Sequence, residues 1–315
     1  MSRVLAASIT AHELAVKRRT VVFGPVDLAV PAGGLLVVEG PAGSGKSSLL
    51  LTLGGRMRPT SGDVAVGGLD VPRQSRQVRR TVGLGPFADV NDLDDALTVE
   101  QHLAERLVMH HPWWRPTVGR ARVLELAARL DALLDTIEPV ARQVYACLAG
   151  QGVPLREQRP VDPGGSQDPA PLLPRLRPRE RVSRLSPLER FVLGVLLGVA
   201  EDPRVLVVDD VDQLRDAQER LAGWALLAAL TTPGGGRPRL TMVATCEDAT
   251  AVAASAGAIS RATGRAVQVV DLPSGTQMAA SAPESAPEPA AAATSEPPPG
   301  RTTDTGSAPT PEETH

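Results

Sequence analysis

The 315-residue sequence is poor in several features that usually mark a function. Its two cysteines, Cys147 and Cys246, lie far apart without metal-ligand spacing, so we expect reduced thiols rather than a disulfide framework or a metal centre. The longest apolar run, from Phe191 to Ala200, is too short to cross a bilayer. No internal repeat and no heptads of coiled-coil length stand out. These absences exclude disulfide-rich, membrane-spanning and coiled-coil proteins.

A large charge of one sign is also missing, since the net charge is −3. Residues 274–315 are almost entirely Ala, Pro, Ser, Thr, Glu and Gly, with six acidic residues and Arg301 as the one basic residue. Such a segment cannot bury enough apolar surface to offset the entropy of ordering, so we predict a disordered tail after a folded domain of residues 1–273. That domain is then about +2, which gives no reason to expect nucleic acid as a partner.

Lysine is the scarcest charged residue, because 31 of the 33 basic residues are arginine. One of the two lysines, Lys46, lies in the run from Gly40 to Ser47, which fits G-x-x-x-x-G-K-[ST], the phosphate-binding loop. Glycines there let main-chain N–H groups surround phosphate oxygens, and a compact ammonium fits between β- and γ-phosphates where a guanidinium would not. We therefore predict ATP binding, with Mg²⁺ on the Ser47 hydroxyl. The predicted nucleotide-binding residues are Gly40, Pro41, Ala42, Gly43, Ser44, Gly45, Lys46, Ser47 and Ser48.

The flanks of this loop have the character that the motif requires. Residues 35–39 predict a short buried strand, and residues 47–53 begin an apolar helix whose N-terminus would face the phosphates. Further along, Val205 to Val208 predict another buried strand, which ends in Asp209 and Asp210. A strand can simply end in an acidic turn, but beside a phosphate loop we favour Asp209 as a Mg²⁺ ligand opposite Ser47.

Strand and helix patterns alternate along the folded part. Residues 1–75 look β-rich, residues 98–200 look mainly helical, and residues 150–175 hold six prolines, which predicts a mobile loop. The order predicts an α/β fold: a P-loop NTPase core with a central, mainly parallel sheet, a β-rich N-terminal part and an inserted helical subdomain. The expected later elements are helices near 98–108, from 119, over 187–200 and 216–230, and strands at 205–208, 241–245 and 266–270.

In combination these motifs resemble the ATP-binding-cassette (ABC) transporter ATPases, over residues 13–272. Residues 33–67 look like that family's opening, with the loop, a helix ending in glycine, and Arg-Pro-x-Ser-Gly before a strand. Residues 97–100 (LTVE) resemble the start of its helical subdomain. Residues 185–190 (LSPLER) stand where the family signature is expected, and the strand to Asp209 follows at the usual distance.

The resemblance implies a cassette dimer, homo- or heteromeric, that binds ATP and Mg²⁺ and drives a membrane permease on another chain. It implies that Ser186 contacts the nucleotide of the other subunit and that Asp210 and Lys46 act in catalysis. The implied location is cytoplasmic, peripheral at the inner face of the cell membrane, and we expect no export signal in residues 1–10. The transported substrate would be chosen by the permease.

Several positions depart from the family pattern. After Ser186, Pro187 has no N–H to donate and Leu188 adds a side chain where close backbone approach is wanted. Asp210 replaces the catalytic glutamate and is one methylene shorter, a misplacement that can cost about a hundredfold in rate. We expect either slow ATP hydrolysis, which we favour because Asp210 keeps a carboxylate, or a regulatory or scaffold protein that binds ATP without hydrolysing it.

Three further family positions also differ. The glutamine that contacts Mg²⁺ falls near Phe87, with Asn91 or Asp92 as alternatives, and the switch histidine falls at Cys246. The aromatic residue that stacks on adenine falls near residues 17–18, where an arginine could stack instead.

Three further segments of the sequence are conspicuous. His110-His111 predicts a solvated turn, and the arginines of residues 175–184 predict a solvated stretch before a helix. Trp113 and Trp114 are two of only seven aromatic residues; they are either half-buried anchors or a contact with the permease.

Overall fold

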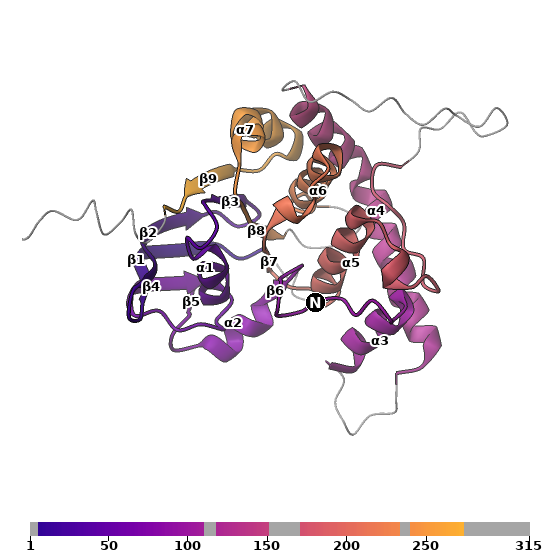
Figure 1. Ribbon diagram of the computed structural model, residues 1–315, viewed down its shortest axis with the longest axis horizontal. Helices are drawn as coiled ribbons and strands as arrows, with labels where there is room; N and C mark the ends of the chain where they lie inside the picture. The colour runs from indigo at the N-terminus through magenta and orange to yellow at the C-terminus, as the bar shows by residue number, and fades with distance from the viewer. Residues whose placement is uncertain (1–5, 110–117, 151–170, 234–239, 274–315) are drawn as a thin grey trace, which may run out of the picture. The chain divides into compact units, whose positions relative to one another are not determined.

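The computed structural model describes residues 6–109, 118–150, 171–233 and 240–273 (Figure 1). The predicted disordered tail lies outside these ranges, as do His110, His111, Trp113, Trp114 and residues 151–170 of the predicted mobile loop. The described residues form two sheets and a set of helices, so the predicted α/β class with a β-rich N-terminal part is confirmed.

The N-terminal sheet is antiparallel, with its four strands in the order β2-β1-β4-β5. Exposed and buried residues alternate along much of β2, as expected for a sheet with one solvated face. The strands are β1 (Ile9–Lys17), β2 (Val21–Val30), β4 (Ser61–Val66) and β5 (Leu69–Asp70).

The central sheet is parallel throughout, in the order β6-β7-β8-β3-β9. Its strands are β3 (Leu35–Glu39), β6 (Val82–Leu84), β7 (Val205–Val208), β8 (Thr241–Cys246) and β9 (Val267–Asp271). Strands β7 and β8 are buried along their whole length, the continuous apolar pattern of a sheet covered on both faces. The predicted mainly parallel sheet is confirmed, and the carboxyl ends of β3, β7 and β8 meet at one edge.

Each face of the central sheet packs into its own hydrophobic core. On β3, Leu35 and Val37 belong to the cluster formed with the helices, whereas Leu36 and Val38 belong to the cluster formed with the N-terminal sheet. This period-two division follows from the pleat of a strand, which directs successive side chains to opposite faces.

The helices are α1 (Lys46–Leu53), α2 (Ser75–Thr81), α3 (Val99–Met109), α4 (Arg120–Ala149), α5 (Pro187–Val199), α6 (Ala217–Ala229) and α7 (Thr250–Thr263), with 3₁₀ turns at Val182–Arg184 and Val211–Gln213. The 30-residue α4 continues through Pro139 and packs against α6 and α7. Its length, the short β6 and the Ala-rich α7 were not expected from the sequence. Among these helices, none is both long and apolar enough to cross a membrane.

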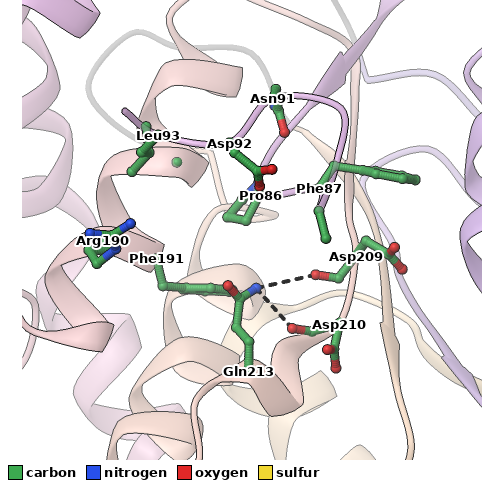
Figure 2. A pocket seen from close by; sticks show the side chains of 12 residues that line it. Pro86, Phe87, Asn91, Asp92, Leu93, Arg190, Phe191, Asp209, Asp210 and Gln213 are labelled. Atoms are coloured by element: carbon green, nitrogen blue, oxygen red, sulfur yellow. Dashed lines mark hydrogen bonds between the residues drawn. The ribbon is translucent and has the colours of Figure 1, made fainter. Parts of the chain in front are cut away.

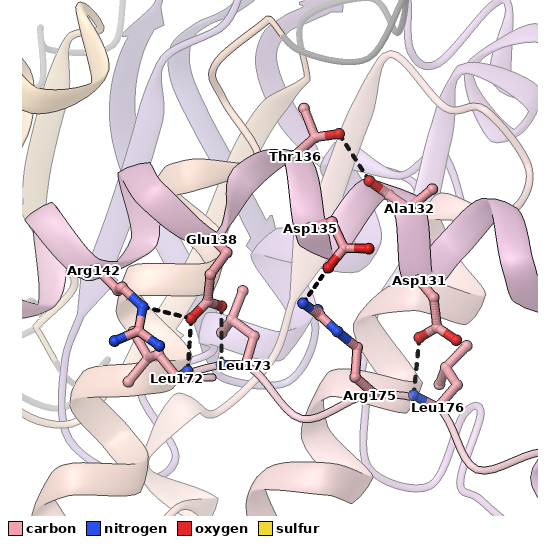
Figure 3. Close-up of polar contacts among 10 residues, drawn as sticks. All are labelled: Asp131, Ala132, Asp135, Thr136, Glu138, Arg142, Leu172, Leu173, Arg175 and Leu176. Atoms are coloured by element: carbon pink, nitrogen blue, oxygen red, sulfur yellow. Dashed lines mark hydrogen bonds and ion pairs between the residues drawn. The ribbon is translucent and has the colours of Figure 1, made fainter. Parts of the chain in front are cut away.

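Acidic residues of α4 hold the extended segment 172–176 that leads towards α5 (Figure 3). Glu138 accepts hydrogen bonds from the main-chain N–H groups of Leu172 (2.7 Å) and Leu173 (3.2 Å). Asp131 accepts from the N–H of Leu176 (3.0 Å), and Asp135 pairs with Arg175. These residues recur about every turn of α4, so one side of this helix holds the returning chain through hydrogen bonds.

Candidate nucleotide-binding site

The loop after β3 is shaped by two glycines in the left-handed backbone region. Gly45 (φ +90°) immediately precedes α1, and a Cβ built there would lie 2.2 Å from the carbonyl oxygen of Val22. Gly43 (φ +80°) has the same kind of conformation but open space around it. The loop therefore needs glycine at residue 45 both for its φ angle and for its close approach to β2.

The N-terminus of α1 is left without a side-chain cap, because Gly45 has no side chain to accept a hydrogen bond. The first N–H groups of a helix have no partner in a preceding turn, so those of Lys46, Ser47 and Ser48 are available to an anion. Lys46 lies at the same opening, where its ammonium donates to the carbonyl oxygens of Gly40 (2.5 Å) and Pro41 (3.0 Å).

Asp209 faces this helix start from the end of β7. Its side chain is buried, and its two oxygens have separate hydroxyl donors: Ser47 Oγ donates to Oδ2 (2.6 Å) and Thr245 Oγ1 donates to Oδ1 (2.6 Å). Ser47 is 162 residues away in the chain, so the fold brings together the two residues that the sequence pairs as metal ligands. A hydroxyl and a carboxylate are the oxygen donors that Mg²⁺ takes.

Asp210 follows in the left-handed conformation (φ +51°), and its N–H donates to Thr245 Oγ1 (2.8 Å). Desolvation, followed by the negative charges of Asp212, Asp209 and Glu247, raises the pKa of Asp210, while the Lys46 ammonium opposes them. The carboxylate thus lies beside the loop in a locally acidic environment.

Ser186 lies at the N-cap of α5 and is engaged in a capping box. Its hydroxyl accepts from the N–H of Glu189 (3.2 Å), and the Glu189 carboxylate accepts from the N–H of Ser186 (2.7 Å). Pro187 occupies the first helical turn, where a missing N–H costs no helical bond. The departures at the signature position therefore make a regular helix start.

A pocket of about 140 Å³ lies between Phe87, Asn91, Asp210 and Gln213, among other residues (Figure 2). The Asn91 amide donates to the carbonyl oxygen of Gly85 (2.7 Å), and its own oxygen is buried without a partner among the described residues. Asp92 accepts a hydrogen bond from the N–H of Asp89 (3.0 Å). Neither Asn91 nor Asp92 has a hydrogen bond to the Ser47–Asp209 pair in this part of the chain, so their role as a glutamine substitute stays a prediction.

Cys246 ends β8 beside Glu39 and is completely buried. Burial, reinforced by the carboxylates of Asp212 and Glu39, raises the pKa of Cys246 to about 12, so its thiol is neutral near pH 7. The main-chain N–H of the next residue, Glu247, donates a hydrogen bond to the Asp212 carboxylate (2.6 Å). Residues 17 and 18, the predicted adenine-stacking position, are exposed at the turn between β1 and β2.

Two residues that the sequence analysis did not single out contact the acidic pair. Thr245 bonds to both Asp209 and Asp210, as described above. Gln213 donates from its amide nitrogen to the carbonyl oxygens of Asp210 (2.9 Å) and Asp209 (3.4 Å) (Figure 2). A hydroxyl at the carboxyl end of a strand beside β7 is a signal that could have identified Thr245.

Comparison with known proteins identifies the family. Its profile, described as ABC transporter, matches residues 23–212, more than half of the chain. The cytochrome c biogenesis ATP-binding export protein CcmA of Pseudomonas putida is 35% identical over 100 residues, 31% of this chain and 46% of that protein. The match thus spans less than half of CcmA. The phosphonates import ATP-binding protein PhnC of Chromohalobacter salexigens is 27% identical over 208 residues, 63% of this chain and 73% of that protein.

Among solved structures, the dimeric bacterial ABC transporter cassette MJ0796 superposes with a TM-score of 0.55 at 17% identity, covering 85% of this chain and 95% of the cassette. This likeness extends the shared fold beyond the segment matched by the family profile. The chain belongs to the ABC transporter family.

Proposed function

We propose that this chain is the ATP-binding subunit of an ABC-type transporter, and that it binds Mg·ATP and hydrolyses it slowly. The observation that carries the proposal is the uncapped start of α1, which opens beside Lys46 and the Ser47–Asp209 pair. Membership of the family supports it, as do the names of CcmA and PhnC, which both describe ATP-binding proteins.

In this proposal the main chain of the loop binds the phosphates. The N–H groups at the start of α1 donate to phosphate oxygens, and Lys46 exchanges the carbonyl oxygens of Gly40 and Pro41 for the β- and γ-phosphates. Ser47 and Asp209 would hold Mg²⁺, whose chemistry is to neutralise charge on the transferred phosphoryl group.

Asp210 then orients the attacking water. It follows Asp209 directly and lines the pocket with Phe87 and Gln213. An aspartate reaches about one methylene less far than a glutamate, and a misplacement of that size costs on the order of a hundredfold in rate. Slow hydrolysis is the expected consequence.

Phosphate release from the purified protein tests this proposal. The wild type should release phosphate above the level of Asp210→Asn and Lys46→Ala, and Asp210→Glu should raise the rate by about tenfold or more because it restores the longer reach. Release by the wild type no faster than by either control would reject hydrolysis.

The alternative is a regulatory or scaffold protein that binds ATP without hydrolysing it. The capping box favours it, because the Ser186 hydroxyl and the Glu189 N–H are already paired with each other. Binding of Mg·ATP without phosphate release, in wild type and Asp210→Glu alike, would support this alternative.

Dimerisation and a permease partner complete the proposal. Asp210→Asn with Mg·ATP should elute as a dimer in size-exclusion chromatography with light scattering, and Lys46→Ala should remain monomeric. A monomer under every condition would contradict the dimer.

Co-expression with a neighbouring gene for a multi-span membrane protein should bring the chain to the membrane fraction, at the cytoplasmic face. Absence of the chain from that fraction would contradict the permease partnership.

A further inference from the structure

Thr245 is fully buried on β8, yet its hydroxyl forms hydrogen bonds with both members of the acidic pair, Asp209 and Asp210. Its hydroxyl donates to Asp209 Oδ1 and accepts from the Asp210 N–H. The parallel register brings it there, since Val208 of β7 lies opposite Ala244 of β8, and the residues that follow them in the chain are Asp209 and Thr245.

The direction of these bonds fixes the carboxylate of Asp209. The Thr245 hydroxyl oxygen accepts a hydrogen bond from the Asp210 N–H. The single hydrogen of this hydroxyl is therefore directed to Oδ1 of Asp209. Oδ2 is then the oxygen that faces Ser47 and the loop. Rotation of this carboxylate would break its buried hydrogen bond to Thr245.

The same hydroxyl also holds the main chain of Asp210. A non-glycine residue at φ +51° is strained and persists where neighbouring contacts favour it. The bond from the Asp210 N–H to Thr245 is such a contact, at 2.8 Å. One buried hydroxyl therefore sets the orientation of one carboxylate and the backbone position of the next.

We propose that Thr245 is a positioning residue that orients Asp209 for Mg²⁺, an inference that rests on the proposed function. It acts through Asp209 and does not touch the nucleotide. Outer hydrogen-bond partners of metal ligands typically contribute 10–100-fold to metal affinity, so its loss should appear in Mg²⁺-dependent binding.

The test measures ATP affinity with Mg²⁺ and with EDTA for Thr245→Val and Thr245→Ser. Valine keeps the branched shape and removes the hydroxyl, whereas serine keeps the hydroxyl. Thr245→Val should weaken Mg·ATP binding about 10–100-fold and change binding in EDTA by less than about twofold. Thr245→Ser should stay within about threefold of the wild type in both conditions.

Thr241→Val is the matched control on the same strand. Thr241 is equally buried, donates to the carbonyl oxygen of Ala7 (2.7 Å) and accepts from the N–H of Gly33 (2.8 Å), but lies at the opposite end of β8. This variant should lower the melting temperature as Thr245→Val does and leave the Mg²⁺ dependence unchanged. If Thr245→Val does not fold, Thr245→Ala replaces it in the comparison with Thr245→Ser.

The outcomes separate this inference from the proposed function. A wild type that does not bind Mg·ATP rejects the proposed function and this inference together. A wild type that binds, beside a folded Thr245→Val with unchanged Mg²⁺ dependence, rejects the role of Thr245 alone. An equal loss with Mg²⁺ and in EDTA, or the same Mg²⁺-specific loss in Thr241→Val, would also overturn it.

Discussion

The starts of α1 and α5 use similar residues in opposite ways. At α1, Gly45 provides no cap and the Ser47 hydroxyl bonds across the sheet to Asp209. At α5, Ser186 caps its own helix and Glu189 closes the box, so hydroxyl, carboxylate and N–H groups are paired within four residues. Both pair a serine with an acid, but only at α5 does the serine cap its own helix.

The difference shows what turns a helix start into a ligand site. A side-chain cap satisfies one of the unpaired N–H groups at a helix start, so fewer donors remain there for an anion. An uncapped helix whose first N–H groups lie beside a lysine and a hydroxyl–carboxylate pair offers all of its donors to a phosphate. We therefore propose that the start of α1 serves a ligand, whereas the capping box at the start of α5 stabilises the fold.

Substitution of Gly45, at the start of α1, should have the largest effect on stability and on Mg·ATP binding. Gly45→Ala combines a left-handed φ angle with a contact of 2.2 Å to Val22, so we expect a loss of about 3 kcal/mol or more in unfolding free energy, and loss of Mg·ATP binding. Gly43→Ala is the matched control, because its Cβ meets open space and only the φ strain of about 1 kcal/mol remains. Urea denaturation measures the unfolding free energy of both variants. Equal losses would contradict the close approach of residue 45 to the carbonyl oxygen of Val22.

Loss of the hydrogen bonds between α4 and the segment 172–176, which leads to α5, should have the next largest effect on stability. Glu138→Ala removes the acceptor of two main-chain N–H groups, so we expect a loss of about 2 kcal/mol in unfolding free energy. Glu125→Ala, at an exposed position of the same helix, should change stability by less than about 0.5 kcal/mol. Thermal or urea unfolding measures the difference, and equal losses in the two variants would show that the hydrogen bonds of Glu138 to the segment 172–176 do not stabilise the fold.

Two serine substitutions separate the helix starts directly. Ser186→Ala should cost about 1 kcal/mol of stability, the usual contribution of an N-cap, and leave Mg·ATP binding by the monomer unchanged. Ser47→Ala should weaken Mg·ATP binding by about tenfold and leave stability nearly unchanged, since Ser47 is exposed and water can replace its hydroxyl as a donor to Asp209. Weaker Mg·ATP binding by Ser186→Ala would contradict the difference between the two helix starts. A loss of stability in Ser47→Ala equal to that in Ser186→Ala would contradict it as well.

The smallest expected effect concerns the thiol beside the loop. Because the pKa of Cys246 is about 12 and the thiolate is the reactive form, alkylation of Cys246 should stay slow from pH 7 to pH 9. Cys147, which is partly exposed, should react first. Mass spectrometry of the alkylated native protein checks the order, and early labelling of Cys246 would contradict its burial.

The sequence predicts the elements whose signal is local. The run from Gly40 to Ser47 predicts the loop because its glycines and lysine are contiguous, and the apolar run before Asp209 predicts β7. The alternation of β3 between two cores also follows from the strand period.

The remaining features depend on contacts between distant residues. The role of Thr245 depends on the register of β7 and β8, which one strand's sequence does not specify. Helix α4 passes Pro139 because residues such as Leu134, Ile137 and Ala141 bury one face on both sides of it. Tertiary packing there overrides the usual cost of an internal proline.

Calorimetric titration of Mg·ATP into the purified chain is the decisive experiment. We expect saturable binding of one nucleotide per chain, weakened at least about tenfold in Lys46→Ala, since that ammonium lies at the uncapped helix start. Absence of binding by folded wild-type protein, or equal affinity in Lys46→Ala, would contradict it.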